Sequence, residues 1–307
     1  MKRGGAPGRR GFLKTSAAAA LALASPAAGF AGERMQKRRI PASGEEIPVV
    51  GLGTSDEFEH VPADGGTQLK AVLAELVDAG GTLVDTAPAY GHAERVLGGF
   101  FRESGLTDTL FISTKVSARG ARRGLESMER SAKRLGKGPL DLLMVHSLVD
   151  ARTHLETLKR RKEDGRIRHI GITTSRESGF EEMESLIRSQ PLDFIQVNYS
   201  PMEPRAAERV IPAAAERGIA VMINRPFGNG AWFGEVADRE LPAWAAEFDC
   251  GSWAQFSLKY ILGHPDVTCV LAATSNPRHM RDNAGAGMGR LPGDALRRRI
   301  AAYVENL

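Results

Sequence analysis

The sequence has 307 residues but only two cysteines, Cys250 and Cys269. Two thiols are too few for a disulfide framework, and they lack the paired spacing of a zinc site. Cys269 lies in the apolar run 267–271, which predicts a core residue rather than a reactive thiol. A single bridge between the two after export stays open, because the sequence does not bring the sulfurs together.

Near the N-terminus the sequence lacks a run long enough for a membrane anchor. The apolar stretch 17–24 is soon followed by Pro26, whereas a spanning helix needs about 20 apolar residues. The basic stretch 8–14 (GRRGFLK) precedes this run, and small residues at 29–31 follow it. This order is typical of a removable signal, and the arginine pair resembles a twin-arginine export signal.

We therefore expect two segments with different roles. Residues 1–31 are predicted to be a signal peptide for the twin-arginine export machinery, with the periplasm as destination and no stable membrane anchor. Residues 32–307 are predicted to form the mature domain. A disordered basic tail is the alternative interpretation of the first segment.

An excess of charge is also absent once the signal is set aside. The whole chain carries 41 basic and 37 acidic residues, and five of the basic residues lie in segment 1–31, which has no acids. The mature chain therefore has 36 basic and 37 acidic residues, a net charge of −1. The basic isoelectric point belongs to the signal, so the sequence gives no support for nucleic-acid binding.

Short apolar runs alternate with longer amphipathic segments along the mature chain. The predicted strands are 49–53, 82–85, 110–115, 141–146, 169–173, 194–198, 220–224 and 267–272. Helical spacing is found in 69–77, 125–135, 155–162, 181–188, 205–217 and 253–262. Apolar strands separated by helices favour a parallel sheet covered by helices.

Eight such units in about 250 residues predict an α/β fold, the (β/α)8 TIM barrel. Segments 38–40 and 46–49 are expected to form a small hairpin that closes the bottom of the barrel. The competing doubly wound fold would need a glycine-rich phosphate turn after its first strand. The stretch Gly51-Leu52-Gly53-Thr54 is too short for that turn.

Ionisable side chains stand at the carboxyl ends of three neighbouring predicted strands. Asp85 ends the second strand, Tyr90 lies in the loop after it, Lys115 ends the third and His146 ends the fourth. Each alone has an ordinary structural explanation, such as an ion pair or a packed ring. Because chemistry in such barrels occurs at this end of the strands, their gathering favours a functional site.

The four side chains suit proton transfer to an oxygen. A free tyrosine has a pKa of about 10, too high for easy proton donation at neutral pH. A nearby lysine cation is expected to lower that pKa, and the aspartate to hold the lysine. The histidine can hydrogen-bond a substrate oxygen. The set fits reduction of a carbonyl by hydride, which requires a nicotinamide cofactor because no side chain donates hydride.

The chain resembles the aldo-keto reductase superfamily over residues 36–287. The stretch VDTAPAYGHAERVLG (84–98) is close to the family's Asp…Tyr-Gly-x-x-Glu-x-x-Leu-Gly signature. FISTKV (111–116) resembles its lysine strand and LDLLMVHSL (140–148) its histidine strand. Later cofactor-binding positions are matched by GRIRHIGITT (165–174), FIQVNYSP (194–201) and NPRHMRDN (276–283).

The resemblance implies a (β/α)8 barrel that reduces aldehydes or ketones with NADP(H), or with NAD(H) as the alternative. It assigns Tyr90 as general acid, Lys115 and Asp85 as the pair that tunes it, and His146 as the residue that orients the small-molecule carbonyl substrate. Asp85 would also meet the nicotinamide ribose. The other implied cofactor-binding residues are Gly53, Thr54, Thr173, Thr174, Gln196, Arg225, Pro226, Phe227, Gly228, Thr274, Ser275, His279 and Asn283.

Three positions depart from the family pattern. Thr174 stands where an asparagine usually binds the carboxamide, and Asn224 where many relatives have an aromatic ring against the nicotinamide. Arg225 replaces a serine in the usual Ser-Pro-Leu-Gly. We expect its guanidinium to bind the cofactor pyrophosphate, with a solvated loop residue as the alternative.

Two other classes of protein are alternatives to the reductase. A non-catalytic barrel that binds nicotinamide nucleotide, as a redox sensor or partner-docking protein, is the main alternative. A barrel hydrolase lacks support, because no close carboxylate pair or metal-binding cluster stands at the strand ends. For the substrate pocket, the loops after the strands offer Phe58, His60, Trp232 and Phe233 as candidate walls.

Overall fold

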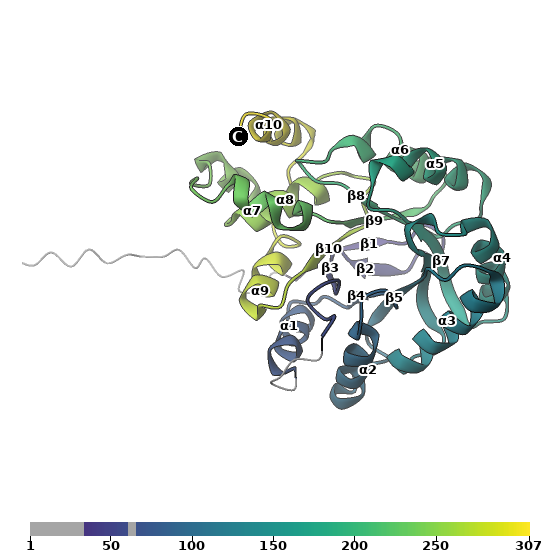
Figure 1. Cartoon of the computed structure of the whole chain (residues 1–307). Coiled ribbons are helices and arrows are strands. Elements are labelled where there is room, and N and C mark those ends of the chain that lie inside the picture. The colour runs from purple at the N-terminus through teal and green to yellow at the C-terminus, as the bar shows by residue number, and fades with distance from the viewer. Residues whose placement is uncertain (1–33, 61–65) are drawn as a thin grey trace, which may run out of the picture. The chain divides into compact units, whose positions relative to one another are not determined.

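The computed structural model describes residues 34–60 and 66–307. Within them, eight parallel strands form a closed barrel in the order β10-β3-β4-β5-β6-β7-β8-β9 (Figure 1). The strands are β3 Val50–Gly53, β4 Leu83–Asp85, β5 Phe111–Val116, β6 Leu140–Val145, β7 Ile167–Thr173, β8 Phe194–Asn198, β9 Ala220–Asn224 and β10 Cys269–Ala273. The predicted (β/α)8 barrel is confirmed.

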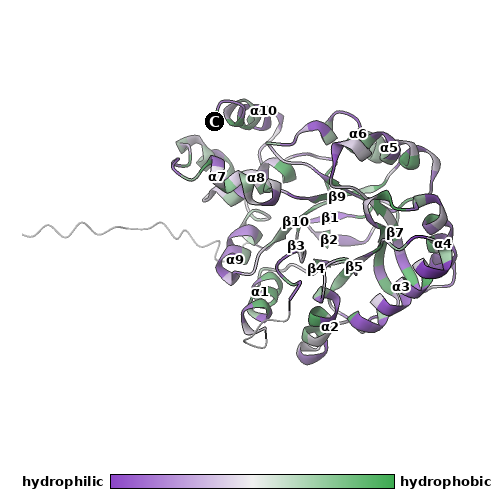
Figure 2. Cartoon of the chain, viewed as in Figure 1, coloured by the Kyte–Doolittle hydropathy of each residue, from purple (hydrophilic) through white to green (hydrophobic). Residues whose placement is uncertain are grey.

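Helices surround the barrel on its outer side (Figure 1). They are α1 Thr67–Asp78, α2 Ala93–Ser104, α3 Ala121–Leu135, α4 Ala151–Glu163, α5 Phe180–Ser189, α6 Val210–Glu216, α7 Ala231–Glu235, α8 Trp253–Leu262, α9 Pro277–Gly285 and α10 Asp294–Val304. Each helix carries both hydrophobic and hydrophilic residues along its length (Figure 2). In α3, for example, Met128 and Leu135 are buried while Arg123 and Arg130 are exposed.

One predicted helix is shorter in the structure. The segment 205–217 divides into a 3₁₀ turn, Arg205–Ala207, and the helix α6, Val210–Glu216. Pro212 explains the difference because it lacks a backbone N–H and is tolerated in the first turn of a helix. A helix that began at Arg205 would have placed this proline in its interior.

A two-stranded antiparallel hairpin, β1 Lys37–Arg39 with β2 Glu46–Pro48, lies behind the barrel strands in Figure 1. The first strand is displaced by one residue from the predicted segment 38–40, and the second begins at the predicted residue 46 but ends one residue early. Ile40 and Ile47 are fully buried and join the cluster of side chains that fills the barrel interior, including Leu142 and Met222. The hairpin therefore closes one end and leaves the carboxyl ends of the strands as the open mouth.

Both cysteines are buried free thiols. Cys269 lies on β10 in the barrel interior, and its burial raises the pKa of the thiol above its usual value. Burial raises the pKa of Cys250 to about 12. Both therefore stay protonated at neutral pH, as core thiols do. None of the described helices combines the length and the apolar character needed to cross a membrane.

Candidate active site

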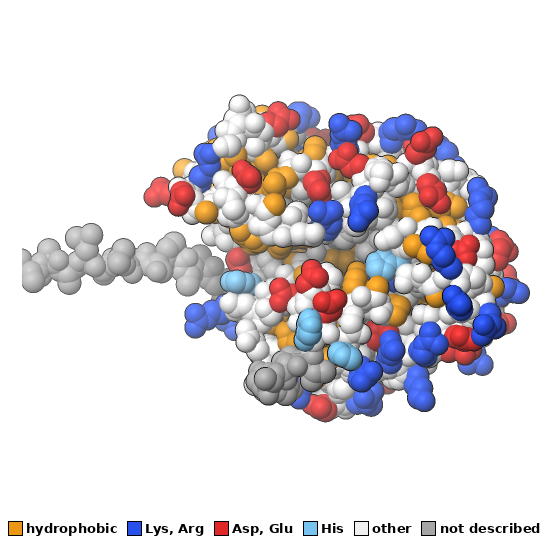
Figure 3. Space-filling view, in the orientation of Figure 1, with side chains coloured by type: hydrophobic (Ala, Val, Ile, Leu, Met, Phe, Trp, Pro, Cys, Tyr) orange, Lys and Arg blue, Asp and Glu red, His pale blue; other side chains and the backbone are white. Residues whose placement is uncertain are grey.

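A cavity of about 860 Å³ opens at the carboxyl ends of the barrel strands. Its walls come from the loops and ends of β3, β4, β6, β7, β8, β9 and β10, and from helices α8 and α9. Figure 3 shows a hollow near the centre of this face, with acidic side chains on one side and basic side chains on the other. The cavity lies where barrel enzymes bind their ligands.

A buried ion pair forms the floor of this site. Lys115 on β5 is fully buried, and its Nζ donates to Oδ2 of Asp85 at 2.6 Å and to the backbone oxygen of Thr86 at 3.0 Å. Ser113, two residues earlier on β5, donates to the other carboxylate oxygen of Asp85 at 2.7 Å. Because alternate residues of a strand point the same way, β5 directs both side chains at one carboxylate.

Tyr90 and His146 complete the group predicted from the strand ends. The Lys115 Nζ stands 5.0 Å from the centroid of the Tyr90 ring. His146 follows β6 directly, and its ring meets that of Tyr90 edge-on with centroids 5.7 Å apart. Both rings border the cavity, whereas Lys115 lies beneath its surface. The structure thus brings the four side chains from three adjacent strands together.

The pKa of Tyr90 shifts in the direction opposite to the one expected from the sequence. Burial raises the pKa of Tyr90 above its ordinary value, and the Lys115 cation opposes this effect without reversing it. The pKa of Lys115 is also raised, since Asp85 and Tyr90 outweigh the desolvation that would lower it. Tyr90 is therefore a neutral phenol at neutral pH, and the cation limits the cost of removing its proton.

His146 is held in its neutral form. Burial, assisted by the Lys115 cation, lowers the pKa of His146 to about 4. A neutral imidazole has one N–H donor and one nitrogen acceptor. The ring can therefore donate a hydrogen bond to an oxygen in the cavity over the whole neutral range of pH.

Most residues expected to hold a nicotinamide cofactor line the same cavity. These are Gly53, Thr54, Asp85, Thr173, Gln196, Arg225, Pro226, Phe227, Thr274, His279 and Asn283. Thr174, Gly228 and Ser275 are not among the lining residues. Thr174 instead uses its backbone. Its N–H donates to the backbone oxygen of Gln196 at 3.0 Å, and its backbone oxygen accepts from the side-chain amide of Asn224 at 3.1 Å.

Unpaired polar groups in this region fit a polar ligand. Among the described residues, the buried side-chain oxygens of Asn198 and Asn224 have no hydrogen-bond partner, and β8 and β9 place these two residues side by side. Asn224 also lines the cavity. Buried acceptors are costly to leave unpaired, and a carboxamide or a ribose hydroxyl supplies the missing donors. The residues present therefore fit a nicotinamide nucleotide.

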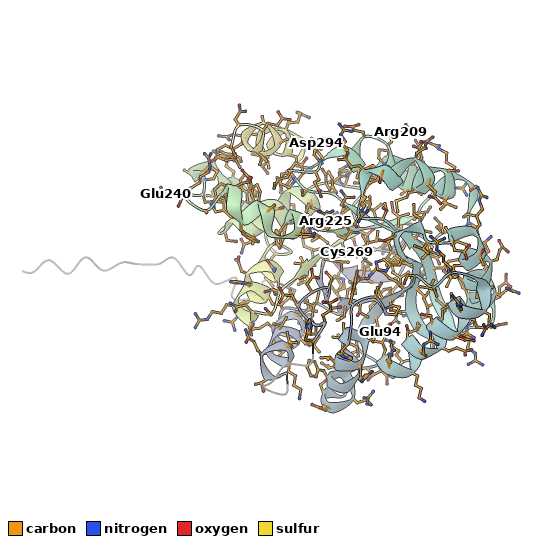
Figure 4. The ribbon with its side chains drawn as sticks, viewed as in Figure 1. Glu94, Arg209, Arg225, Glu240, Cys269 and Asp294 are labelled. Atoms are coloured by element: carbon orange, nitrogen blue, oxygen red, sulfur yellow. The ribbon has the colours of Figure 1, made fainter. Side chains whose placement is uncertain are left out.

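Arg225 is held in place rather than solvated. Its φ of 50° lies in the left-handed region, which is uncommon for a residue other than glycine. Nη1 donates to the backbone oxygen of Ser175 at 2.9 Å, and Nη2 lies 3.9 Å from Glu203. The buried Nε has no partner among the described residues. This guanidinium, labelled in Figure 4, is therefore available to an anionic group in the cavity that it lines.

The candidate pocket walls are only partly as expected. Phe233 lines the cavity, is 44% exposed, and packs on Phe227 with ring centroids 5.0 Å apart. Phe58 and Trp232 instead belong to the core, at 0% and 1% exposure. His60 is exposed and lies outside the cavity. Large apolar rings in loops gain more free energy from core burial than from a water-filled wall.

Several wall residues were not predicted from the sequence. Asp56 and Glu57 follow β3, Arg176 follows β7, and Trp253 begins α8. Asp56 has a left-handed φ of 63°, a conformation that aspartate adopts more readily than most residues. For Asp56, Glu57 and Arg176, a position in a loop after a strand was the one feature of the sequence that could have indicated this role. The described residues contain no group of three or more side chains suited to a metal ion.

The chain belongs to the Aldo/keto reductase family, whose sequence pattern matches residues 50–299. The aldo-keto reductase YhdN of Bacillus subtilis is 30% identical over 221 residues, which span 66% of this chain and 66% of the relative, just under two-thirds of its length. An aldo-keto reductase of Mycobacterium sp. (strain KMS) is 34% identical over 197 residues, covering 61% of this chain and 67% of that protein.

Solved structures of the same kind share the fold. An aldo-keto reductase from Bacillus halodurans superposes with a TM-score of 0.73 at 21% identity, covering 88% of this chain and 96% of that one. An aldo-keto reductase from Klebsiella pneumoniae in complex with NADPH gives a TM-score of 0.72 at 24% identity, covering 88% and 95%.

Proposed function

We propose that this protein reduces an aldehyde or ketone to an alcohol with NADPH as hydride donor. The observation that carries the proposal is the buried Lys115–Asp85 pair beneath Tyr90, with neutral His146 against the same ring. Membership of the Aldo/keto reductase family and the NADPH bound to the structural relative from Klebsiella pneumoniae support it.

Different residues of the cavity would bind the different parts of the nucleotide. Gln196 and Asn224 would hold the carboxamide, and Asp85 the nicotinamide ribose. Arg225 would face the pyrophosphate, while Thr274, His279 and Asn283 would meet the adenosine end. When bound, the cofactor supplies the hydride that no side chain can provide.

The chain's own residues handle the proton. The carbonyl oxygen accepts hydrogen bonds from the Tyr90 hydroxyl and from the N–H of His146, which orients it. As the carbonyl carbon gains hydride, negative charge develops on this oxygen and Tyr90 gives up its proton to it. The Lys115 cation stabilises the resulting phenolate, and Asp85 keeps the ammonium in place. Solvent then restores the proton to Tyr90.

A redox sensor that binds nucleotide without turnover is the alternative function. A cofactor-oxidation assay with a panel of aldehydes and ketones, run beside a fluorescence titration of NADPH, separates the two. Oxidation that depends on the carbonyl compound supports the reductase. Tight NADPH binding with no carbonyl-dependent oxidation would support the sensor and exclude the proposed activity.

We further propose that the protein is exported to the periplasm by the twin-arginine machinery. The proposal rests on the sequence of residues 1–31, which lie outside the described residues. A twin-arginine route carries folded chains, so the nucleotide can be bound before transport. Protein purified from the periplasm should therefore be tested for retained NADP(H) by release into acid and enzymatic assay of the extract.

A further inference from the structure

Three consecutive residues of β5 hold the two ends of the segment that carries Tyr90. Ser113 and Lys115 face the barrel interior and bind the Asp85 carboxylate, as described above. Thr114 points to the opposite side of the strand, where its Oγ1 donates to Oε1 of Glu94 at 2.8 Å. The first and last residues of segment 85–94 are therefore both hydrogen-bonded to the same short piece of β5.

Glu94 is a buried carboxylate in the first turn of α2, only 2% exposed (Figure 4). Its second oxygen, Oε2, lies 3.2 Å from Nη1 of Arg134 on α3, and this ion pair balances the buried charge. Burying a carboxylate is costly unless it is paired and hydrogen-bonded. The fold keeps this charge four residues after Tyr90, bonded to the residue of β5 that directly precedes Lys115.

The backbone between Glu94 and Tyr90 is short and bonded to itself. The backbone N–H of Ala93 donates to the backbone oxygen of Tyr90 at 2.9 Å, and the backbone N–H of Tyr90 donates to the backbone oxygen of Ala87 at 3.0 Å. Gly91 has a φ of 50°, and a Cβ there would lie 2.7 Å from the backbone oxygen of Glu59. A shift of the first turn of α2 would therefore move the Tyr90 ring with it.

We propose that Glu94 is a positioning residue, which sets the height of the Tyr90 ring over Lys115 through its hydrogen bond to Thr114. The inference rests on the proposed function of Tyr90 as proton donor. Proton transfer requires the reacting atoms to lie within a few tenths of an ångström of their productive geometry. The Thr114–Glu94 hydrogen bond links the turn that carries Tyr90 to the strand that carries Lys115.

The test compares Thr114→Val with Arg134→Gln. Valine matches threonine in shape and removes only the donor to Glu94. Arg134→Gln weakens the ion pair of the same carboxylate but leaves the Thr114 bond intact. Glu94→Ala is a third variant, and Thr114→Val keeps the test available if Glu94→Ala does not fold. Each protein is measured for kcat with saturating NADPH, for NADPH affinity, and for thermal unfolding.

We expect Thr114→Val to lower kcat about tenfold and Glu94→Ala about 100-fold, the loss that a misplacement of about 1 Å can cause. NADPH affinity should stay within about twofold of the wild type in both. Arg134→Gln should lower the unfolding temperature while its kcat stays near that of the wild type. Equal kcat values for Thr114→Val and the wild type would overturn the proposal.

A second readout separates positioning from mere structural support. The Tyr90 phenol is followed by NMR of the protein carrying ¹³C-labelled tyrosine, with Tyr90→Phe to assign the signal. Because Lys115 counteracts the raised pKa of Tyr90, displacement of the ring should raise that pKa further in Thr114→Val. A Tyr90 pKa that does not change would assign Glu94 to fold stability alone. This measurement needs no turnover, so it tests the positioning even if the assay finds no carbonyl reduction.

Discussion

Lys115 Nζ and Asp85 Oδ2 lie 2.6 Å apart, and neither side chain is more than 5% exposed to solvent. A buried ion pair of this kind is weak evidence for stability, because desolvation of both charges offsets their attraction. Removal of one partner is different, since it leaves the other charge buried alone. The presence of this ion pair is therefore better explained by function than by a contribution to folding stability.

Lys115→Met should abolish most turnover and destabilise the protein by about 3–5 kcal/mol, because the Asp85 charge is left unpaired. The double variant Asp85→Asn/Lys115→Met removes both charges and should recover much of that stability without recovering activity. Chemical denaturation and the carbonyl-dependent assay measure the two effects. Activity returning together with stability in the double variant would show that the lysine acts through folding alone.

Tyr90→Phe should abolish carbonyl reduction while NADPH binding stays largely intact, because the substitution removes the ionisable proton and little of the ring's packing. Loss of a general acid typically lowers the rate about 10²–10⁴-fold. A larger fall in kcat would indicate that the Tyr90 hydroxyl also orients the substrate. Steady-state kinetics and a fluorescence titration measure both quantities. Near-normal reduction by this variant would remove Tyr90 from the mechanism.

The lowered pKa of His146 predicts a pH dependence of stability. The folded protein takes up this proton near pH 4, whereas the unfolded chain takes it up near 6.5. Between these values the unfolded state binds more protons, so stability is full above 6.5 and falls as the pH drops toward 4. A shift of this size is worth roughly 3 kcal/mol.

The measurement is the free energy of unfolding at pH 7 and pH 4 in the wild type and in His146→Gln. Burial also lowers the pKa of His169 and His264, so the informative quantity is the difference between the two proteins. We expect the wild type to lose more stability than the variant on acidification. Identical losses would mean that the His146 imidazole titrates as it does in the unfolded chain.

The sequence predicts the strands well because their buried, β-branched runs carry a strong local signal. The helix α10 was not predicted. Ile300 is the one buried residue in Asp294–Val304, so the apolar periodicity of this segment is weak. The four residues at the strand ends could be predicted because the barrel topology brings them together. That prediction needed no knowledge of side-chain packing.

The pocket walls could not be predicted in the same way. Phe58 lies in the loop after β3 and Phe233 in the short helix α7 after β9, yet the first is buried in the core and the second is 44% exposed. Their difference depends on how each segment packs on the helices beside it, which no local pattern encodes. The sign of the Tyr90 pKa shift was missed for a related reason, because the effect of burial outweighs that of the Lys115 cation.

Export can be tested by changing Arg9 and Arg10 to lysine. If residues 8–14 form a twin-arginine signal, the substituted precursor should remain in the cytoplasm while the wild type reaches the periplasm. Cell fractionation followed by immunoblotting shows where each protein accumulates. A control substitution of Lys14 to arginine keeps the charge and should not block export. Unchanged export of the Arg9/Arg10 variant would contradict the signal.

The last prediction concerns the choice between NADPH and NADH. Relatives that strongly prefer NADPH commonly bind its 2′-phosphate with a lysine and an arginine. By resemblance, the lysine position matches Ala273 in this chain and the arginine position matches His279. Both residues line the cavity, and the His279 ring lies 3.4 Å from the Asn276 amide. Arg278, one residue away on α9, is exposed and is not part of the cavity lining. We therefore expect NADPH to be preferred, but less strongly than in those relatives.

The preference should depend on His279 but fall short of that given by an arginine, whose guanidinium binds a phosphate through two parallel hydrogen bonds. Dissociation constants for NADPH and NADH are compared in the wild type, in His279→Ala and in the control Arg278→Ala. His279→Ala should reduce the preference and Arg278→Ala should retain it. Thr274 lines the cavity and remains a neutral donor, so a residual preference should persist in both variants. A large preference that survives removal of His279 would show that other residues bind the phosphate.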